Sequence, residues 1–184
     1  MFEDYLADAT FFLSEARRTN QANDEEGARR NYRAAVIVGV AAMETFINYI
    51  AITFEAAGEK GLERYELALL LDKRFGQDDG RFRIQERPQY SRLEDKLRFL
   101  IHRFAIGLNF GTSTEWEQFM RFKGLRDSLV HSKKDEDDTL LKDYESVCSR
   151  GIWASIQLMQ LLSKGIFGKP LRAKLLDLVP TEDA

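Results

Sequence analysis

Cysteine and proline are scarce in this sequence of 184 residues. Cys148 is the only cysteine, which excludes an intrachain disulfide and a zinc site built from several cysteines of one chain. A lone thiol is typical of a reducing compartment, so we expect a cytoplasmic protein. The prolines stand at 88, 170 and 180, which leaves residues 1–87 free of a residue that breaks helical hydrogen bonding. Long helices are therefore possible in that part of the chain.

The sequence also lacks a strong excess of charge. Lys and Arg number 27 against 30 Asp and Glu, which gives a net charge of −3 and a pI of about 5.6. Bulk charge gives no reason to expect nucleic acid, although a local basic patch can still bind it. With 44% hydrophobic and 31% charged residues, the composition is that of a globular protein. The length fits a single domain over residues 1–184.

No long apolar run is free of polar residues. The longest, 34–54, is interrupted by Glu44, Thr45, Asn48 and Tyr49, so it is interpreted as a buried core helix and not as a membrane span. The first residues are acidic and lack a basic segment, so we expect no signal peptide and no membrane partner.

Apolar residues recur at helical spacing over most of the chain. This spacing predicts helices over 3–19, 25–57, 62–73, 91–106, 115–132 and 139–164, and a shorter one over 171–178. Asp24 and Thr114 are predicted N-caps, Gly58 is a predicted C-cap, and Ser91 with Glu94 forms a predicted capping box. The predicted fold class is all-α, a helical bundle of four to five long helices with a short C-terminal helix.

Residues 74–90 differ in character. Two glycines, a proline and no apolar period predict a loop or insertion, with only a weak strand-like alternation of Phe82 and Ile84. From 81 to 103, seven basic residues against three acidic ones give a net charge of +4. A solvated helix face explains this charge. The alternative is a track for an RNA backbone, with Phe82 or Tyr90 stacking on a base.

The helix predicted over 115–132 has an arginine on its apolar side. That side consists of Phe119, Phe122, Leu125, Leu129 and Val130. At about 100° per residue, Arg126 falls between Phe122 and Phe119 on the wheel. An arginine keeps its charge, so burying it without a partner is costly. We expect either an internal carboxylate, with Glu44 the predicted partner, or a cleft or second subunit at this face.

His131 follows Arg126 by five residues, about 140° around the helix. One copy of the chain therefore does not aim both side chains at one point, but a two-fold axis could bring two Arg/His pairs together. Asp127 stands four residues before His131 and can orient its imidazole. The segment 121–134 has a net charge of +4, which supports an anion site. It contains Arg121, Lys123, Arg126, Lys133 and Lys134 against Asp127.

The run Arg126-Asp127-Ser128-Leu129-Val130-His131 resembles the Arg-x4–6-His motif of HEPN domains (higher eukaryotes and prokaryotes nucleotide-binding). In that family a polar residue commonly follows the arginine, and the motif precedes a final long helix. The segment 41–48, with small residues and Glu44, is similar to the second helix of the family. The resemblance implies a homodimer with a composite groove, in a family where many members are metal-independent ribonucleases.

In such an enzyme, His131 would act as general acid or base and Arg126 would hold the scissile phosphate. Asp127 or Ser128 would orient the pair. The products would carry 2′,3′-cyclic phosphate and 5′-hydroxyl ends, and no cofactor is implied. Other members are non-catalytic binding or assembly modules. The implied setting is stress, toxin–antitoxin or defence, with an antitoxin or another protein as partner.

The remaining candidate residues are predicted to have supporting or structural roles. Arg121, Lys123 and Lys133 are candidate RNA contacts. Glu44 and Asn48 are either hydrogen-bonded in the core or support the Arg126 site from beneath. The structural alternatives are an Arg126–Glu44 ion pair and a His131 favoured by the helix dipole. Cys148, Trp116 and Trp153 are predicted to be packing residues.

Overall fold

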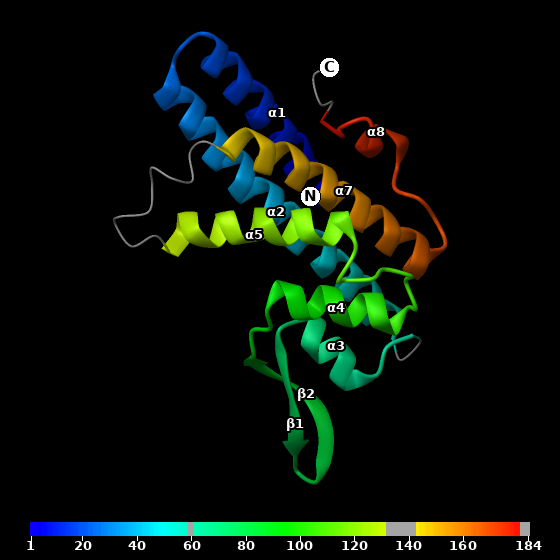
Figure 1. Cartoon of the computed structure of the whole chain (residues 1–184). Coiled ribbons are helices and arrows are strands. Elements are labelled where there is room, and N and C mark those ends of the chain that lie inside the picture. Colours follow the sequence, from blue (N-terminus) through cyan, green and yellow to red (C-terminus); the bar gives the residue numbers. More distant parts are fainter. Residues whose placement is uncertain (59–60, 132–142, 181–184) are drawn as a thin grey trace. The chain divides into compact units, whose positions relative to one another are not determined.

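The computed structural model describes residues 1–58, 61–131 and 143–180. Contacts divide the chain into two compact units, here named the helical unit (Met1–Met43 with Gly107–Ala184) and the hairpin unit (Glu44–Ile106). The described residues are mostly helical, as predicted, and carry one two-stranded sheet. The helices are α1 (Phe2–Gln21), α2 (Glu25–Ala57), α3 (Arg64–Leu70), α4 (Leu93–Arg103), α5 (Thr114–His131), α7 (Tyr144–Phe167) and α8 (Ala173–Leu176), and the strands are β1 (Lys73–Asp78) and β2 (Arg81–Pro88) (Figure 1).

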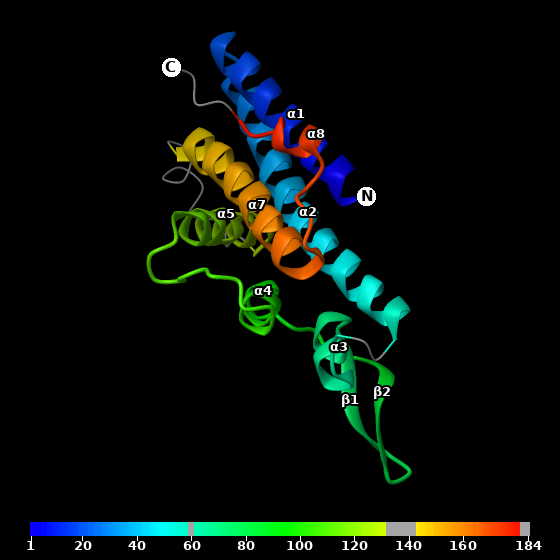
Figure 2. The same ribbon diagram turned by 90° about the vertical axis from the view of Figure 1, so that its right-hand side faces the viewer.

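The helical unit packs α1, the first part of α2, α5 and α7 around a shared core. In both views α1 runs beside α2, and α5 lies along α7 (Figures 1 and 2). α1 buries Leu6, Ala9, Leu13 and Ala16, a spacing of three and four residues that keeps them on one helix face. α7 is buried on almost every side, including Ile152, Ile156, Met159 and Leu162. It is therefore the central helix of this unit.

α2 is the one described helix that is long and apolar enough to cross a membrane by length and composition alone. Of its most apolar stretch, 56% is buried inside the protein. Val36, Val40 and Met43 are fully buried. This burial agrees with the prediction of a core helix.

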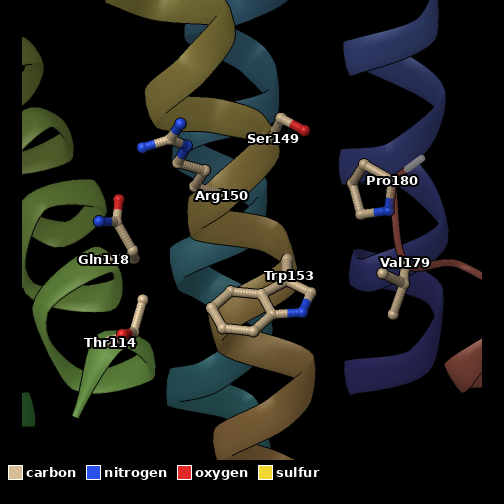
Figure 3. Close-up of a pocket in the computed structure, with 7 residues that line it drawn as sticks. All are labelled: Thr114, Gln118, Ser149, Arg150, Trp153, Val179 and Pro180. Carbon is tan, nitrogen blue, oxygen red and sulfur yellow. The ribbon is translucent and has the colours of Figure 1, made fainter. Parts of the chain in front are cut away.

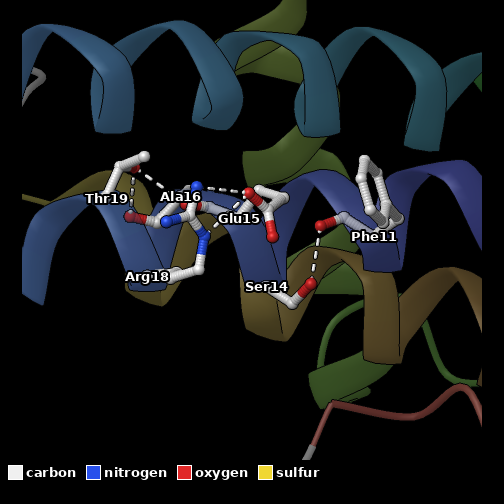
Figure 4. Close-up of polar contacts among 6 residues, drawn as sticks. All are labelled: Phe11, Ser14, Glu15, Ala16, Arg18 and Thr19. Atoms are coloured by element: carbon white, nitrogen blue, oxygen red, sulfur yellow. Dashed lines mark hydrogen bonds and ion pairs between the residues drawn. The ribbon is translucent and has the colours of Figure 1, made fainter.

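The polar side of α1 satisfies its own hydrogen-bonding groups (Figure 4). Ser14 Oγ donates to the carbonyl of Phe11 at 2.7 Å, and Thr19 Oγ1 donates to that of Glu15 at 2.8 Å. The Arg18 guanidinium pairs with Glu15 at 2.8 Å. Because these contacts stay within one helix, that side needs no partner, and the apolar side is left to pack against the core.

A carboxylate at the start of α7 joins three helices. Glu145 pairs with Arg17 of α1 at 3.0 Å and accepts a hydrogen bond from the Tyr32 hydroxyl of α2 at 3.0 Å. Tyr32 also stacks on Tyr144, with ring centroids 6.1 Å apart. Burial, then the nearby Glu145 charge, raises the pKa of Tyr32. Burial likewise raises the pKa of the Cys148 thiol, so this residue stays a neutral core group, as predicted.

One aromatic ring of α5 is wedged between two glycines. Phe122 is fully buried, with Gly39 of α2 and Gly151 of α7 beside it. A Cβ atom at Gly151 would lie 2.2 Å from Phe122 Cγ, and one at Gly39 would lie 2.7 Å from Phe122 Cζ. Since real side chains cannot come so close, both neighbouring helices depend on glycine to approach α5.

Two of the predicted helix ends are confirmed. Asp24 Oδ1 accepts a hydrogen bond from the Gly27 backbone N–H at 2.9 Å, which caps α2. At the other end, Gly58 follows Ala57 with φ of +71°, a left-handed conformation that favours glycine.

The other two predicted caps are wrong. α4 begins at Leu93 with Arg92 at the N-cap position and no side-chain cap, and the Ser91 backbone N–H instead donates to Asp72 Oδ1 at 2.8 Å. At α5 the cap is Ser113, one residue before Thr114, and its Oγ accepts from the Trp116 N–H at 3.1 Å.

Residues 74–90, predicted as a loop or insertion, contain an antiparallel hairpin. β1 and β2 pair from Asp78–Arg81 to Arg74–Gln85, with an irregularity at Lys73. The connecting residues Asp79 and Gly80 both have positive φ, 49° and 72°. Two-residue hairpin turns of this kind require such φ values and favour Asp-Gly, because its twist matches that of the strands.

A buried cation fixes the base of the hairpin. Lys96 of α4 has a side chain only 7% exposed, and its Nζ donates to Asp72 Oδ2 at 2.6 Å and to the Leu70 carbonyl at 3.1 Å. The Asp72 carbonyl accepts from the Gln89 N–H at 2.8 Å. Asp72 thereby links the residues before and after the hairpin to α4.

Replacing Lys96 by methionine should lower the free energy of unfolding by about 2 kcal/mol, because Asp72 and the Leu70 carbonyl lose a charged donor. Urea unfolding followed by circular dichroism would measure the loss. Lys73→Met is the matched control. Its ammonium pairs with the exposed Glu86 at 3.3 Å, and a surface pair contributes about 1 kcal/mol or less. Equal losses in the two variants would contradict the assignment of Lys96 as an anchor.

Candidate functional site

The position of α5 is set by its buried aromatic and aliphatic side chains. Trp116, Phe119, Phe122 and Leu125 are buried, which confirms most of the predicted apolar face. Leu129 is only half-buried, and Val130 is 53% exposed, so the prediction is wrong for Val130. The last turn of α5 therefore presents side chains outside the core.

Arg126 lies at the border of this core. Its side chain is 22% exposed, as expected for an arginine on a largely apolar face. The Nε atom stands 3.3 Å from Asp127 Oδ1, and Asp127 Oδ2 accepts from Lys123 Nζ at 2.6 Å. One carboxylate thus lies between two cations of the same helix. Counted by themselves, these three side chains carry two positive charges and one negative charge, and a guanidinium is a group that binds phosphate.

His131 is the last residue of α5, and its side chain is exposed. In the part of the chain that the structure describes, Asp127 contacts Arg126 and Lys123 and not His131. The structure therefore brings together the arginine and the aspartate of the motif. The histidine stands separately at the helix end, where its ring is accessible to a ligand or a second subunit.

The remaining predicted residues on α5 are used in different ways. Ser128 Oγ donates to the Gly124 carbonyl at 3.1 Å, within the helix. Arg121 pairs with Asp143, just before α7, at 2.6 Å, so much of its charge is neutralised. Lys133 lies outside the described residues, as does Lys134.

Glu44 and Asn48 lie on the part of α2 that belongs to the hairpin unit. Glu44 is half-buried. Asn48 is exposed and lines a hollow of about 460 Å³ with Ile52 and Tyr90, so the predicted core hydrogen bonding is wrong for Asn48. The Glu44–Arg126 ion pair and the support of the Arg126 site by these two residues stay predictions.

A cavity of about 470 Å³ lies in the helical unit at the opposite end of α5 from His131. In Figure 3, Thr114 and Gln118 of α5 face Arg150 and Trp153 of α7, while Val179 and Pro180 lie beyond Ser149. An indole, an amide, a guanidinium and hydroxyls can together hold a flat polar ligand.

The sequence predictions missed this cavity. Trp153, predicted to be a packing residue, is only half-buried and lines it, whereas Trp116 is 4% exposed and packs as predicted. The cavity walls come from three segments that are distant in the sequence. The only available signal was the Arg150 and Trp153 pair at i and i+3 on one helix face.

The chain was compared with family models, curated proteins and solved structures, and none of them matches it. Among the residues that the structure describes, no group of three or more His, Cys, Asp or Glu side chains is placed to hold a metal ion.

Proposed function

We propose that this chain is a HEPN-like homodimer that binds RNA and cleaves it without a metal, in a groove formed by the ends of two copies of α5. The observation that carries the proposal is the partly buried Arg126 guanidinium held beside Asp127, with an exposed His131 at the end of the same helix. These residues stand in the order Arg-Asp-Ser-Leu-Val-His, which resembles the family motif.

Each side chain has a defined role in this reaction. The ribose 2′-oxygen attacks the adjacent phosphorus, and the bond from phosphorus to the 5′-oxygen breaks. The His131 of one copy takes the proton of the 2′-hydroxyl, and the leaving 5′-oxygen takes a proton from water. Arg126 stabilises the negative charge that develops on the phosphoryl oxygens. The products are a 2′,3′-cyclic phosphate and a 5′-hydroxyl.

The geometry of α5 favours a dimer over a single copy. Arg126 and His131 are about 140° apart around the helix, so one α5 directs them to different sides. A two-fold axis beside the last turn would bring Arg126 of one copy toward His131 of the other. Val130 is 53% exposed on that turn and offers an apolar contact for a partner.

The test is incubation of the purified protein with mixed-sequence RNA in EDTA. We expect shorter RNA fragments that accept a 5′-phosphate from polynucleotide kinase without prior phosphatase treatment, because their 5′ ends are hydroxyls. Light scattering in the same buffer should give the mass of a dimer. Intact RNA in the presence of a folded dimer would refute the cleavage.

A second candidate function is a non-catalytic module of the same fold that binds RNA, a nucleotide or a partner protein. The observation that favours it is the Asp127 carboxylate, which contacts Lys123 and Arg126, so that no carboxylate orients His131 among the described residues. This candidate predicts a stable dimer that retains RNA on a filter and leaves it uncut. A stress, toxin–antitoxin or defence setting with a protein partner fits either candidate.

A further inference from the structure

The hairpin separates its residues into two chemically different faces. Alternate residues of a strand point to opposite sides, and cross-strand partners share a side. The register pairs Arg74 with Gln85 and Gly76 with Arg83, so the odd-numbered residues of β2 share a face with the even-numbered residues of β1. This face, here named the basic face, carries Arg74, Arg81 and Arg83. Arg87 lies in the irregular stretch after Gln85 and lines the same hollow as Arg74 and Arg83, and all four arginines are exposed.

The opposite face is apolar and lies against α3. Phe75 stacks on Phe82 with ring centroids 5.9 Å apart, and Tyr65 of α3 meets Phe75 edge-on at 6.2 Å. Within the hairpin unit, the tip of the hairpin extends beyond the end of α3 in both views (Figures 1 and 2). Phe82 is still 63% exposed, so α3 covers only part of this side. The arginines of the basic face are exposed, so that face is directed to solvent.

A groove of about 680 Å³ runs beside the basic face. Arg74, Arg83 and Arg87 line it together with Gln77 and Gln85. Glu86 is the one acidic residue among its lining residues, and Lys73 Nζ lies 3.3 Å from that carboxylate. Arg81 lies nearer the turn and is not among the residues that line the groove, so the groove contains the three arginines 74, 83 and 87.

We propose that the basic face binds the phosphate backbone of single-stranded RNA. Guanidinium groups bind phosphate through paired charged hydrogen bonds, and in an extended strand the residues of one face repeat about every 6.7 Å. A repeating row of cations matches a repeating anion better than it matches one small ligand. A flexible single strand can follow a twisted ribbon, whereas the deep, narrow major groove of duplex RNA is closed to side chains.

This inference rests on the proposed function insofar as that function makes RNA the substrate. It assigns RNA affinity to the hairpin and leaves the chemistry to α5. The amides of Gln77 and Gln85 offer few groups for reading bases, so the binding should depend weakly on sequence and strongly on salt.

The test compares two triple variants of the full chain. R74Q/R83Q/R87Q removes three charges from the groove, and R29Q/R30Q/R33Q removes three from exposed positions near the start of α2. Fluorescence anisotropy with a labelled mixed-sequence single-stranded RNA gives Kd over a series of salt concentrations. We expect the groove variant to bind about tenfold or more weakly at low salt, and its salt slope to fall by about two, as for three lost phosphate contacts. The α2 variant should match wild type.

Three results would overturn the inference. These are equal weakening of both variants, no weakening of the groove variant, and competition by polyglutamate as effective as that by RNA, which would indicate an acidic protein partner. A thermal melt of each variant checks folding, and R74K/R83K/R87K should restore most of the affinity because it restores the charges.

The cleavage assay separates this inference from the proposed function. If the groove variant binds weakly yet cleaves at saturating RNA at the wild-type rate, both stand. RNA binding that depends on the groove without any cleavage would remove the nuclease and keep the hairpin as an RNA-binding element. Cleavage with unchanged affinity in the groove variant would remove the hairpin inference alone.

Discussion

Replacing His131 by alanine should slow RNA cleavage by about 10²–10⁴-fold, the usual contribution of a general acid or base. Affinity for RNA should change little, because the arginines of the hairpin and the guanidinium of Arg126 remain. Single-turnover cleavage in EDTA at saturating RNA measures this effect without the binding step. His102→Ala is the matched control, since His102 is the other histidine of the sequence, is exposed, and has no role in the proposed reaction. Equal activity of wild type and His131→Ala would remove the histidine from the mechanism.

A mixture of two inactive variants tests whether the proposed catalytic groove at the ends of α5 is formed by two copies of the chain. Arg126→Gln should also be strongly impaired, by about 10²–10³-fold, as for loss of a group that stabilises developing charge. In a mixed dimer with His131→Ala, one groove would combine an intact Arg126 from one copy with an intact His131 from the other. Mixing should therefore restore activity if the two residues act across the dimer. A mixture as inactive as its components would show that they act within one chain or not at all.

The long helices were predictable from sequence because their signals are local. Helical spacing of apolar residues predicted α1, α2 and α5 to within two residues, and Asp24 and Gly58 predicted both ends of α2. α7 ends three residues later than predicted, and its predicted start at 139–142 lies outside the described residues. The hairpin was predicted only as a loop with a weak strand-like alternation, because only one of its faces is apolar and that face is short. Phe75, Phe82 and Ile84 alternate with arginines over a few residues. The Asp79-Gly80 pair was the available signal for the turn.

At the candidate site, too, the features set by local helix geometry were predictable and the choice between competing partners was not. Helix geometry alone places Arg126 near Phe122 on the buried side, and the structure agrees. The partner of Asp127 was not predictable by spacing, because Lys123 and His131 both stand four residues away. The ammonium carries a full charge at neutral pH and contacts Asp127 in the structure. Spacing identifies which residues can meet, and the competition between them decides which do.

Gly151→Ala should lower the free energy of unfolding by about 3 kcal/mol, at the upper end for an overpacked core. The new Cβ would lie 2.2 Å from Phe122 Cγ, and the ring is fully buried with Gly39 of α2 close to its far edge, where a Cβ would lie 2.7 Å from Cζ. The matched control is Gly124→Ala on α5, where a Cβ would meet nothing within 4 Å. The control should gain up to about 1 kcal/mol from helix propensity. Urea unfolding measures both.

Two further results would establish that Phe122 is the cause. Phe122→Leu should recover part of the loss when combined with Gly151→Ala, because a smaller side chain leaves room for the new methyl group. Phe122 also stands one helical turn before Arg126, so a shift of α5 that relieves the clash displaces the candidate site as well. Gly151→Ala should therefore reduce RNA cleavage even at temperatures where the variant is still folded. A variant as stable as wild type would show that α5 and α7 separate easily, and the site could then not depend on their close packing.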